Sequence, residues 1–456
     1  MLMREHKRFF ITLSVSIGAF MSTLDASIVN ISLPTIVVSL NTNLRMVAWV
    51  VTGYLIVITG CLLFVGRVAD LFGQRRTYIL GFIIFTLGSA LCGISNNIYM
   101  LIGSRMIQGL GASSLMVNGT AIIATAFPEE ERGERLGMLG SVISAGFLTG
   151  PILGGFLIEN FGWRYIFFIN LPIGFIGLFF SLKALDKDVP SAKVHLDVWG
   201  AVLFFISISF LLLFLNRIGK GLTPLTIVFI MISLIFIGIF IVVEALSPFP
   251  LVELSLLRKR LFISSLGAGL LSFSIGGAHN FVIPFFLQNI LGFSPSKVGL
   301  MVFPVSLTVM VSAPLGGRFS DRVGVRIPAT IGLAITSLTT FSFTFLKENA
   351  TEYSILWRQI ILGIGIGLFN PANNSAIISS LSKDKVGVAS SFSALSRNLG
   401  LVMGVALAEM IVSLNPITIE KGVPSIESIH NVWRLIIIIG LFAVFLSWVR
   451  GIKNED

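Results

Sequence analysis

Charged residues are scarce in this chain. Asp, Glu, Lys and Arg make up 12% of its 456 residues, whereas hydrophobic residues make up 55%. A soluble protein of this size could not cover its surface with so few polar groups, so the lipid bilayer is the expected solvent.

Residues that bind metals or form disulfides are scarce as well. The chain has 4 His and 2 Cys, and both Cys61 and Cys92 lie inside apolar segments without metal-ligand spacing. This pattern predicts reduced, structural thiols, with neither a disulfide framework nor a metal site. The G-x-x-x-x-G-K-S/T loop of ATP-binding proteins is missing too, so we expect no energy cofactor.

Long hydrophobic runs are what the sequence has in abundance. Fourteen of them are long enough to cross about 30 Å of hydrocarbon as helices, and the short connections carry nearly all the charge. The first run, from Phe9 to about Leu33, is too long for a signal-peptide core and should remain as a spanning helix. The sequence therefore predicts an all-α integral membrane protein that contacts lipids and has no sizeable soluble domain.

The basic residues are spread over many short turns. The net charge is +10, and most of the 32 Lys and Arg residues fall in connections on the side of the two termini. Because positive residues favour the cytoplasmic side, we expect both termini in the cytoplasm and the protein in the cytoplasmic membrane. A nucleic-acid partner is not expected, since no single basic face is formed.

The chain carries internal repeats. The stretch Gly66–Arg75 reads G-R-x-x-D-x-x-G-x-R, and Gly317–Arg326 is a degenerate copy of it. A second element, Arg105 in the fourth run, is echoed by Arg358 in the twelfth. The repeats predict two six-helix halves, 1–185 and 260–456, with two inserted transmembrane helices in 196–247. Repeated halves are typical of secondary transporters.

The charged turn is a candidate conformational latch. Its glycines permit a sharp reversal, and Asp70 can pair with Arg67 or Arg75 or cap a neighbouring helix. Breaking one or two charge-assisted bonds would cost about 1.5–3 kcal/mol each, which is enough to bias two conformations. The alternative is a solvated loop that obeys the positive-inside rule. The candidate latch residues are Gly66, Arg67, Asp70, Gly73, Arg75, Gly317, Arg318, Asp321 and Arg326.

Asp25 is the acid placed deep in a span of the first half. An ionised carboxylate there costs several kcal/mol unless it is paired, solvated or protonated, which makes Asp25 the first candidate for a proton site. Arg105 lies at a similar depth, about 10–14 Å below the outer surface, and could pair with it. The alternative is a static buried ion pair that fixes helix packing.

Gly146, Gly150, Gly154 and Gly155 form a stripe on the fifth run, interrupted by Pro151. Missing side chains let another helix backbone come close, and the proline adds a kink or a free carbonyl. By physics alone, this stripe is typical of ordinary helix packing.

These motifs together resemble the major facilitator superfamily, and within it the fourteen-helix drug:proton antiporter branch, the EmrB/QacA-like group. The resemblance rests on the turn at 66–75, on Leu24–Pro34, on Arg105 with Gln108–Ala112, and on Gly146–Gly155 followed by Trp163–Gly174. It implies the major facilitator fold, with substrate bound between the halves by alternating access, and a glycine stripe associated with export. It also implies a proton-coupled exporter of small amphipathic compounds that needs no cofactor and functions as a monomer.

Further polar residues within the spans are weaker candidates for lining a substrate cavity, because most are equally explained as interhelical hydrogen bonds. They are Asn30, Gln108, His279, Asn280, Asn370, Asn373, Asn374 and Arg397. The spans are electropositive, since Arg105, Arg358 and Arg397 are set against Asp25, and Glu409 lies near a helix end. We therefore expect neutral, zwitterionic or anionic substrates in preference to dications.

Three other functions stay open. An importer or uniporter of the same superfamily would use Asp25 for packing or for substrate binding. A polytopic lipid-modifying enzyme would need clustered His, Asp or Glu at the interface, which the sequence does not offer. A structural or receptor role would leave Asp25 and Arg105 unexplained inside the bilayer.

Overall fold

The computed structural model describes residues 2–185, 198–218, 223–247, 256, 258–381, 386–414 and 424–450. Over these ranges the regular structure is helical, as the apolar runs predict. The helices of the first part are α1 (Leu2–Ser39), α2 (Leu44–Phe72), α3 (Gln74–Gly93), α4 (Ile98–Ala126), α5 (Glu129–Phe161), α6 (Tyr165–Phe168) and α7 (Asn170–Ala184). The next two are α8 (Val198–Ile218) and α9 (Pro224–Leu246). The last part holds α10 (Arg260–Phe285), η2 (Phe286–Ile290), α11 (Pro295–Val323), α12 (Arg326–Phe343), α13 (Glu352–Ser379), α14 (Val386–Ser413) and α15 (Ile426–Val449).

The chain divides into two compact units. Unit 1 holds Met1–Thr42, Trp49–Phe210 and Ile232–Leu251, and unit 2 holds Asn43–Ala48, Leu211–Met231 and Val252–Asp456. Helix α2 is thus shared: its first turn counts with unit 2 and the remainder with unit 1. The predicted boundaries near residues 185, 196, 247 and 260 fall in or next to stretches outside the described residues and stay predictions.

Twelve helices of the described part are long and apolar enough to cross a membrane. The prediction of fourteen spans is therefore met only in part. Helix α8 contributes a shorter apolar segment, Trp199–Leu211, and α12, with 18 residues, is not among the twelve. The reason in α12 is compositional, because Thr and Ser alternate with its apolar residues and lower its hydropathy.

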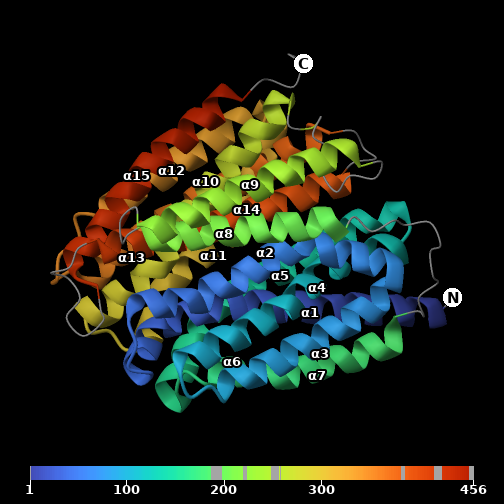
Figure 1. Ribbon diagram of the computed structural model, residues 1–456, viewed down its shortest axis with the longest axis horizontal. Coiled ribbons are helices and arrows are strands. Elements are labelled where there is room, and N and C mark those ends of the chain that lie inside the picture. Colours follow the sequence, from blue (N-terminus) through green and yellow to red (C-terminus); the bar gives the residue numbers. More distant parts are fainter. Residues whose placement is uncertain are drawn as a thin grey trace. The chain divides into compact units, whose positions relative to one another are not determined.

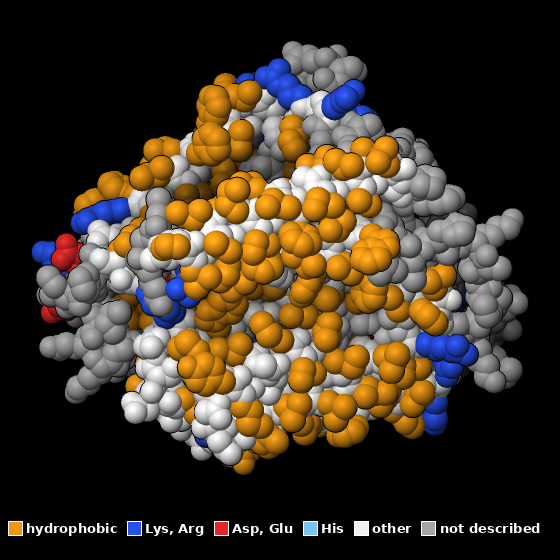
Figure 2. Space-filling view, in the orientation of Figure 1, with side chains coloured by type: hydrophobic (Ala, Val, Ile, Leu, Met, Phe, Trp, Pro, Cys, Tyr) orange, Lys and Arg blue, Asp and Glu red, His pale blue; other side chains and the backbone are white. Residues whose placement is uncertain are grey.

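Hydrophobic side chains cover the middle of the helices. In the face shown in Figure 2, orange side chains dominate, and the blue Lys and Arg side chains lie near the helix ends. Helix α9 illustrates this environment, since its span is 17% buried and has a mean hydropathy of 3.1. Such a helix is stable only in lipid.

Within unit 1, α1 packs against α4, α5 and α7, and α3 packs against α4 and α7 (Figure 1). Within unit 2, α10 packs against α13, α14 and α15, and α12 packs against α13 and α15. The pairing of α1 with α5 in unit 1 thus corresponds to the pairing of α10 with α14 in unit 2.

Glycines produce both pairings. A Cβ atom on Gly146 of α5 would lie 3.1 Å from the carbonyl oxygen of Phe20 in α1. In unit 2, a Cβ atom on Gly400 of α14 would overlap the carbonyl oxygen of Leu270 in α10. Each unit therefore repeats one close backbone approach at the corresponding place, as expected of a duplicated chain.

Candidate functional site

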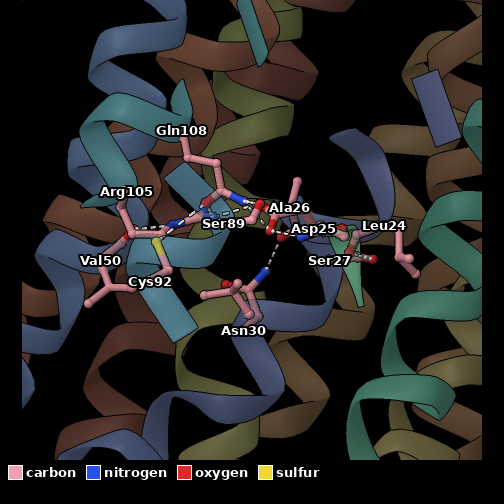
Figure 3. Close-up of polar contacts among 12 residues, drawn as sticks. Leu24, Asp25, Ala26, Ser27, Asn30, Val50, Ser89, Cys92, Arg105 and Gln108 are labelled. Carbon is pink, nitrogen blue, oxygen red and sulfur yellow. Dashed lines mark hydrogen bonds and ion pairs between the residues drawn. The ribbon is translucent and has the colours of Figure 1, made fainter. Parts of the chain in front are cut away.

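Asp25 lies at the centre of a buried polar cluster in unit 1 (Figure 3). Its side chain is 0% exposed. Its Oδ2 accepts a hydrogen bond from Arg105 Nη1 at 2.5 Å. Its Oδ1 accepts one from Gln108 Nε2 at 2.8 Å and one from Asn170 Nδ2 at 2.9 Å. The structure thus brings Asp25 and Arg105 together, with donors from α4 and α7 around the α1 carboxylate.

Arg105 is fixed on several sides as well. Its Nε donates to the carbonyl oxygen of Val50 at 3.1 Å, and its guanidinium lies 3.9 Å from the centre of the Tyr54 ring. Its Nη1 also donates to Gln108 Oε1 at 2.5 Å. Because Val50 and Tyr54 both belong to α2, the guanidinium connects the α1 carboxylate to α2.

Helix α3 completes the cluster. Gln108 Nε2 donates to Ser89 Oγ at 2.7 Å, and the Cys92 thiol donates to Gln108 Oε1 at 3.7 Å. The approach depends on Gly88, where a Cβ atom would lie 2.7 Å from the backbone nitrogen of Gln108. A larger residue at 88 would push α4 away from α3 at the level of the carboxylate.

The cluster contains an electrically balanced ion pair that is buried among membrane-spanning helices. Two charges out of water are tolerable only when their remaining hydrogen-bonding positions are filled, and here three donors fill those of the carboxylate. Addition or loss of one proton at Asp25 would change the net charge of the cluster by one unit. The arrangement can therefore hold either a proton or an ion pair at one buried position.

Sequence reasoning missed several members of this cluster. Asn170 lies within the motif Trp163–Gly174 and has no predicted role, although an Asn in an apolar run is itself a signal of a buried polar partner. Ser89 and Tyr54 are common in spans and carried no signal. Gln108 was assigned to the substrate cavity, whereas the structure buries it beside Asp25.

The sequence echo of Arg105 is not its structural counterpart. Gly109 of α4 approaches the carbonyl oxygen of Tyr54, and Gly363 of α13 approaches that of Val305 in the same manner, with Cβ distances of 2.8 and 2.6 Å. Counting back four residues from each glycine pairs Arg105 with Gln359. Arg358 therefore matches Arg105 in residue type but lies one position before its structural counterpart, Gln359.

Gln359 occupies the interior of unit 2 with His279. The Nε2 atom of His279 lies 3.4 Å from Gln359 Oε1, and the imidazole packs edge-on against Phe343 at 4.8 Å between ring centres. Asn373, another cavity candidate, donates to the carbonyl oxygen of Ser265 at 3.1 Å. These contacts are interhelical hydrogen bonds and packing within one unit.

The other cavity candidates are more accessible. Asn280 and Asn374 are exposed, and Asn374 accepts a hydrogen bond from Ser393. Asn30, Asn370 and Arg397 are half-buried, and Asn30 donates to the carbonyl oxygen one turn earlier in α1. Asn30 and Gln108 belong to unit 1, and the other six candidates belong to unit 2.

The two charged turns share their backbone geometry. Helix α2 ends before Gly73, with φ of 102°, and α11 ends before Gly324, with φ of 82°. Residues that carry a side chain rarely adopt such backbone angles, so glycine is required at both corners. Gly66 and Gly317 lie on the preceding helices and are half-buried.

The arginine after each corner contacts a later helix of its own unit. Arg75 Nη2 donates to the carbonyl oxygen of Leu182 in α7 at 3.0 Å, and the Arg326 guanidinium lies 4.3 Å from the ring centre of Trp448 in α15. Arg318 and Asp321 are exposed. The side chains of Arg67 and Asp70 fall outside the described part, so their predicted pairing stays a prediction.

The glycine stripe of α5 packs against the turn of α1 that carries the carboxylate. A Cβ atom on Gly150 would overlap Ser27, and one on Gly154 would lie 2.6 Å from Ile28. Pro151 and Gly155 are buried beside them.

Among the described residues, no group of three or more His, Cys, Asp and Glu could hold a metal ion.

Comparison with known proteins identifies the relatives of this chain. The family model described as "Major Facilitator Superfamily" matches residues 15–405 and 265–453. The riboflavin transporter RibZ of Clostridioides difficile (strain 630) is 35% identical over 88% of this chain and 87% of its own length. The multidrug transporter protein MdtP of Bacillus subtilis (strain 168) is 30% identical over 93% of this chain and 80% of its own length.

Solved structures agree on the fold. A bacterial homologue of the human lysosomal transporter Spinster, solved in an inward-facing and unoccupied conformation, superimposes with a TM-score of 0.69 and 15% identity. The match covers 97% of each chain. At this identity the likeness shows the fold alone.

Proposed function

The chain belongs to the Major Facilitator Superfamily and is a membrane transporter of small molecules, not an enzyme; from this premise we propose that it is a proton-coupled exporter of small amphipathic compounds. It works as an antiporter by alternating access and functions as a monomer. Fourteen helices cross the cytoplasmic membrane, α8 and α12 included, and both termini are cytoplasmic. Relatives named multidrug transporters support export.

The buried carboxylate of Asp25 is the observation that carries this proposal. It is the proton site, and Arg105 tunes it. In the ionised state the carboxylate holds Arg105, and through it Val50 and Tyr54 of α2. Protonation removes the ionic part of the attraction between carboxylate and guanidinium but leaves the bond from Arg105 to Val50, so the link between α1 and α2 is weakened. A proton at one position can thereby alter how two helices are joined, which is the requirement for coupling.

Proton release tests the assignment. Adding a panel of amphipathic compounds to the detergent-solubilised protein in weak buffer should release protons from the wild type. The variant Asp25→Asn keeps the shape of the side chain but has no titratable proton, so release should fall to the level of a buffer blank. A pH-indicator dye or a microelectrode measures the difference.

Ligand binding by each variant provides the control. If Asp25→Asn still binds the same compound but releases as many protons as the wild type, Asp25 is not the proton site. The variant Cys61→Ser is a suitable comparison, because Cys61 lies on α2 outside the cluster and is not expected to affect release.

The substrates are neutral, zwitterionic or anionic amphipaths. Arg358 and Arg397 lie within helices of unit 2, and Asp25 is neutralised by Arg105, so the charge left over in the spans is positive. A relative named for riboflavin, which is an uncharged aromatic compound, is consistent with this class. Proton-driven efflux of a dicationic dye by the purified protein would contradict it.

The charged turns act as the latch of the outward-facing state. We expect Asp70→Asn to slow turnover about tenfold or more, because it removes a charge-assisted bond of one conformation. Substrate affinity should change less than threefold, roughly, since the turn lies at the end of α2 away from the Asp25 cluster. Transport in vesicles and equilibrium binding give the two values, and a variant that weakens binding while keeping turnover would refute the latch.

A superfamily importer or uniporter is the second candidate, because the name of the riboflavin transporter relative gives a substrate without a direction of transport. Counterflow in proteoliposomes separates the two. An exporter coupled to protons should accelerate when a pH gradient is imposed, whereas a uniporter should exchange labelled substrate at the same rate with and without it.

A further inference from the structure

A second ion pair, with a buried carboxylate, lies at the other end of α2, away from the charged turn. Arg45, in the first turn of α2, donates from Nε to Glu409 Oε1 of α14 at 2.9 Å. The Glu409 side chain is 1% exposed and the Arg45 side chain 32% exposed. Both residues belong to unit 2, Arg45 as part of the segment Asn43–Ala48. By its position in the sequence, Glu409 is an embedded acid near a helix end, and no motif predicts a role for it.

The covalent continuity of α2 connects this pair to the Asp25 cluster. Arg45 precedes Val50, whose carbonyl oxygen binds Arg105, by little more than one helical turn. Tyr54, under the same guanidinium, is one further turn along. The first turn of α2 is thus held by Glu409, and the next two turns are held by Arg105.

We propose that Arg45 and Glu409 are positioning residues of the transport cycle: their ion pair fixes the first turn of α2 on α14 in one conformation and releases it in another. The change in helix α2 is passed to Arg105 through Val50 and Tyr54. The inference rests on the proposed transport function, because it connects the Asp25 proton site to α14 through α2.

The burial of Glu409 distinguishes this pair from an ordinary surface contact. Lys297 and Glu352, also in unit 2, form an ion pair at 2.5 Å with side chains 39% and 50% exposed, where water screens the charges. Glu409 is withdrawn from water, so the Arg45 guanidinium stabilises its charged form more than it would at the surface. Arg45 remains partly accessible, which leaves it able to regain water when the pair separates.

Hydrogen–deuterium exchange of the purified full-length protein tests the contact directly. In Glu409→Gln and in Arg45→Gln, the amides of residues 47–51 should exchange about tenfold faster or more, as expected when a charge-assisted bond is lost. The exchange of peptides from α7 reports whether the fold is kept. The matched control, Lys297→Gln, should leave residues 47–51 unchanged, because its ion pair is exposed and lies on other helices.

A double variant separates positioning from mere stability. Swapping the two charges, Arg45→Glu with Glu409→Arg, should restore slow hydrogen–deuterium exchange and turnover in vesicles. Each single variant should lower turnover while substrate affinity is kept. Unchanged exchange at 47–51 in both single variants would overturn the inference, as would a swap that restores nothing while α7 stays protected. Exchange does not depend on proton coupling, so a negative result with Asp25→Asn would refute the exporter and leave this test standing.

Discussion

Replacing Arg105 with alanine is expected to lower the free energy of unfolding by about 3–5 kcal/mol, because it leaves a buried carboxylate without its cation. The Asp25 side chain is 0% exposed, and its Oδ2 accepts from Arg105 at 2.5 Å. Removal of the guanidinium also leaves the carbonyl oxygen of Val50 without this donor. Unfolding in mixed micelles with increasing denaturing detergent measures the change.

The matched control is Arg358→Ala. Its guanidinium donates to the carbonyl oxygens of Ser342 and Ser354 and lies over the Trp357 ring, and these contacts involve no carboxylate. We expect it to cost about 1 kcal/mol, as for a partly exposed hydrogen-bonded residue. A loss at Arg358 equal to that at Arg105 would show that the Asp25 pair contributes nothing specific.

A double variant completes the cycle. In a protein that already carries Asp25→Asn, the buried charge is gone, so Arg105→Ala should destabilise by much less than it does in the wild type. The coupling energy between two contacting residues is typically about 0.5–3 kcal/mol, and a buried ion pair should be at the upper end. Strict additivity of the two single changes would contradict the ion pair.

The Asp25–Arg105 contact was within reach of sequence reasoning because embedded charges are few. A carboxylate in hydrocarbon needs a partner, and depth along two antiparallel spans placed Arg105 at the same level. The charged turns were readable for a similar reason, since Gly73 and Gly324 occupy corners that other residues rarely adopt. In the first case the bilayer interior accepts few charged residues, and in the second the backbone corner accepts few residues other than glycine.

The rest of the cluster depends on which faces of the helices meet. Asn170, Ser89 and Tyr54 approach Asp25 or its partners only after α2, α3, α4 and α7 come together with α1. The hydrogen bond to the carbonyl oxygen of Val50 cannot be read from residue types, because every residue has that backbone group. The register of the repeat could not be read from the sequence for the same reason. Arg358 matches Arg105 in residue type, but the glycine contacts that align Arg105 with Gln359 are visible only in the structure.

The last prediction concerns two adjacent glycines of α10 that no motif singled out. A Cβ atom on Gly277 would lie 3.0 Å from the Cα atom of Leu401 in α14 and would overlap its carbonyl oxygen. Because backbone cannot rotate away as a side chain does, Gly277→Ala should force the helices apart. The expected cost is about 1–3 kcal/mol or more, with loss of transport.

Gly276 is the control that the chain itself supplies. A Cβ atom there meets nothing within 4 Å, so Gly276→Ala should be neutral or stabilise the protein by up to about 0.5–1 kcal/mol, because alanine favours a helix. The two variants share composition, helix and depth and differ only in the face of α10 that they alter. Equal stabilities in mixed-micelle unfolding would mean that α10 and α14 do not meet at Gly277. A large difference would establish that the second unit depends on the same close approach that brings α5 onto α1 beside Asp25.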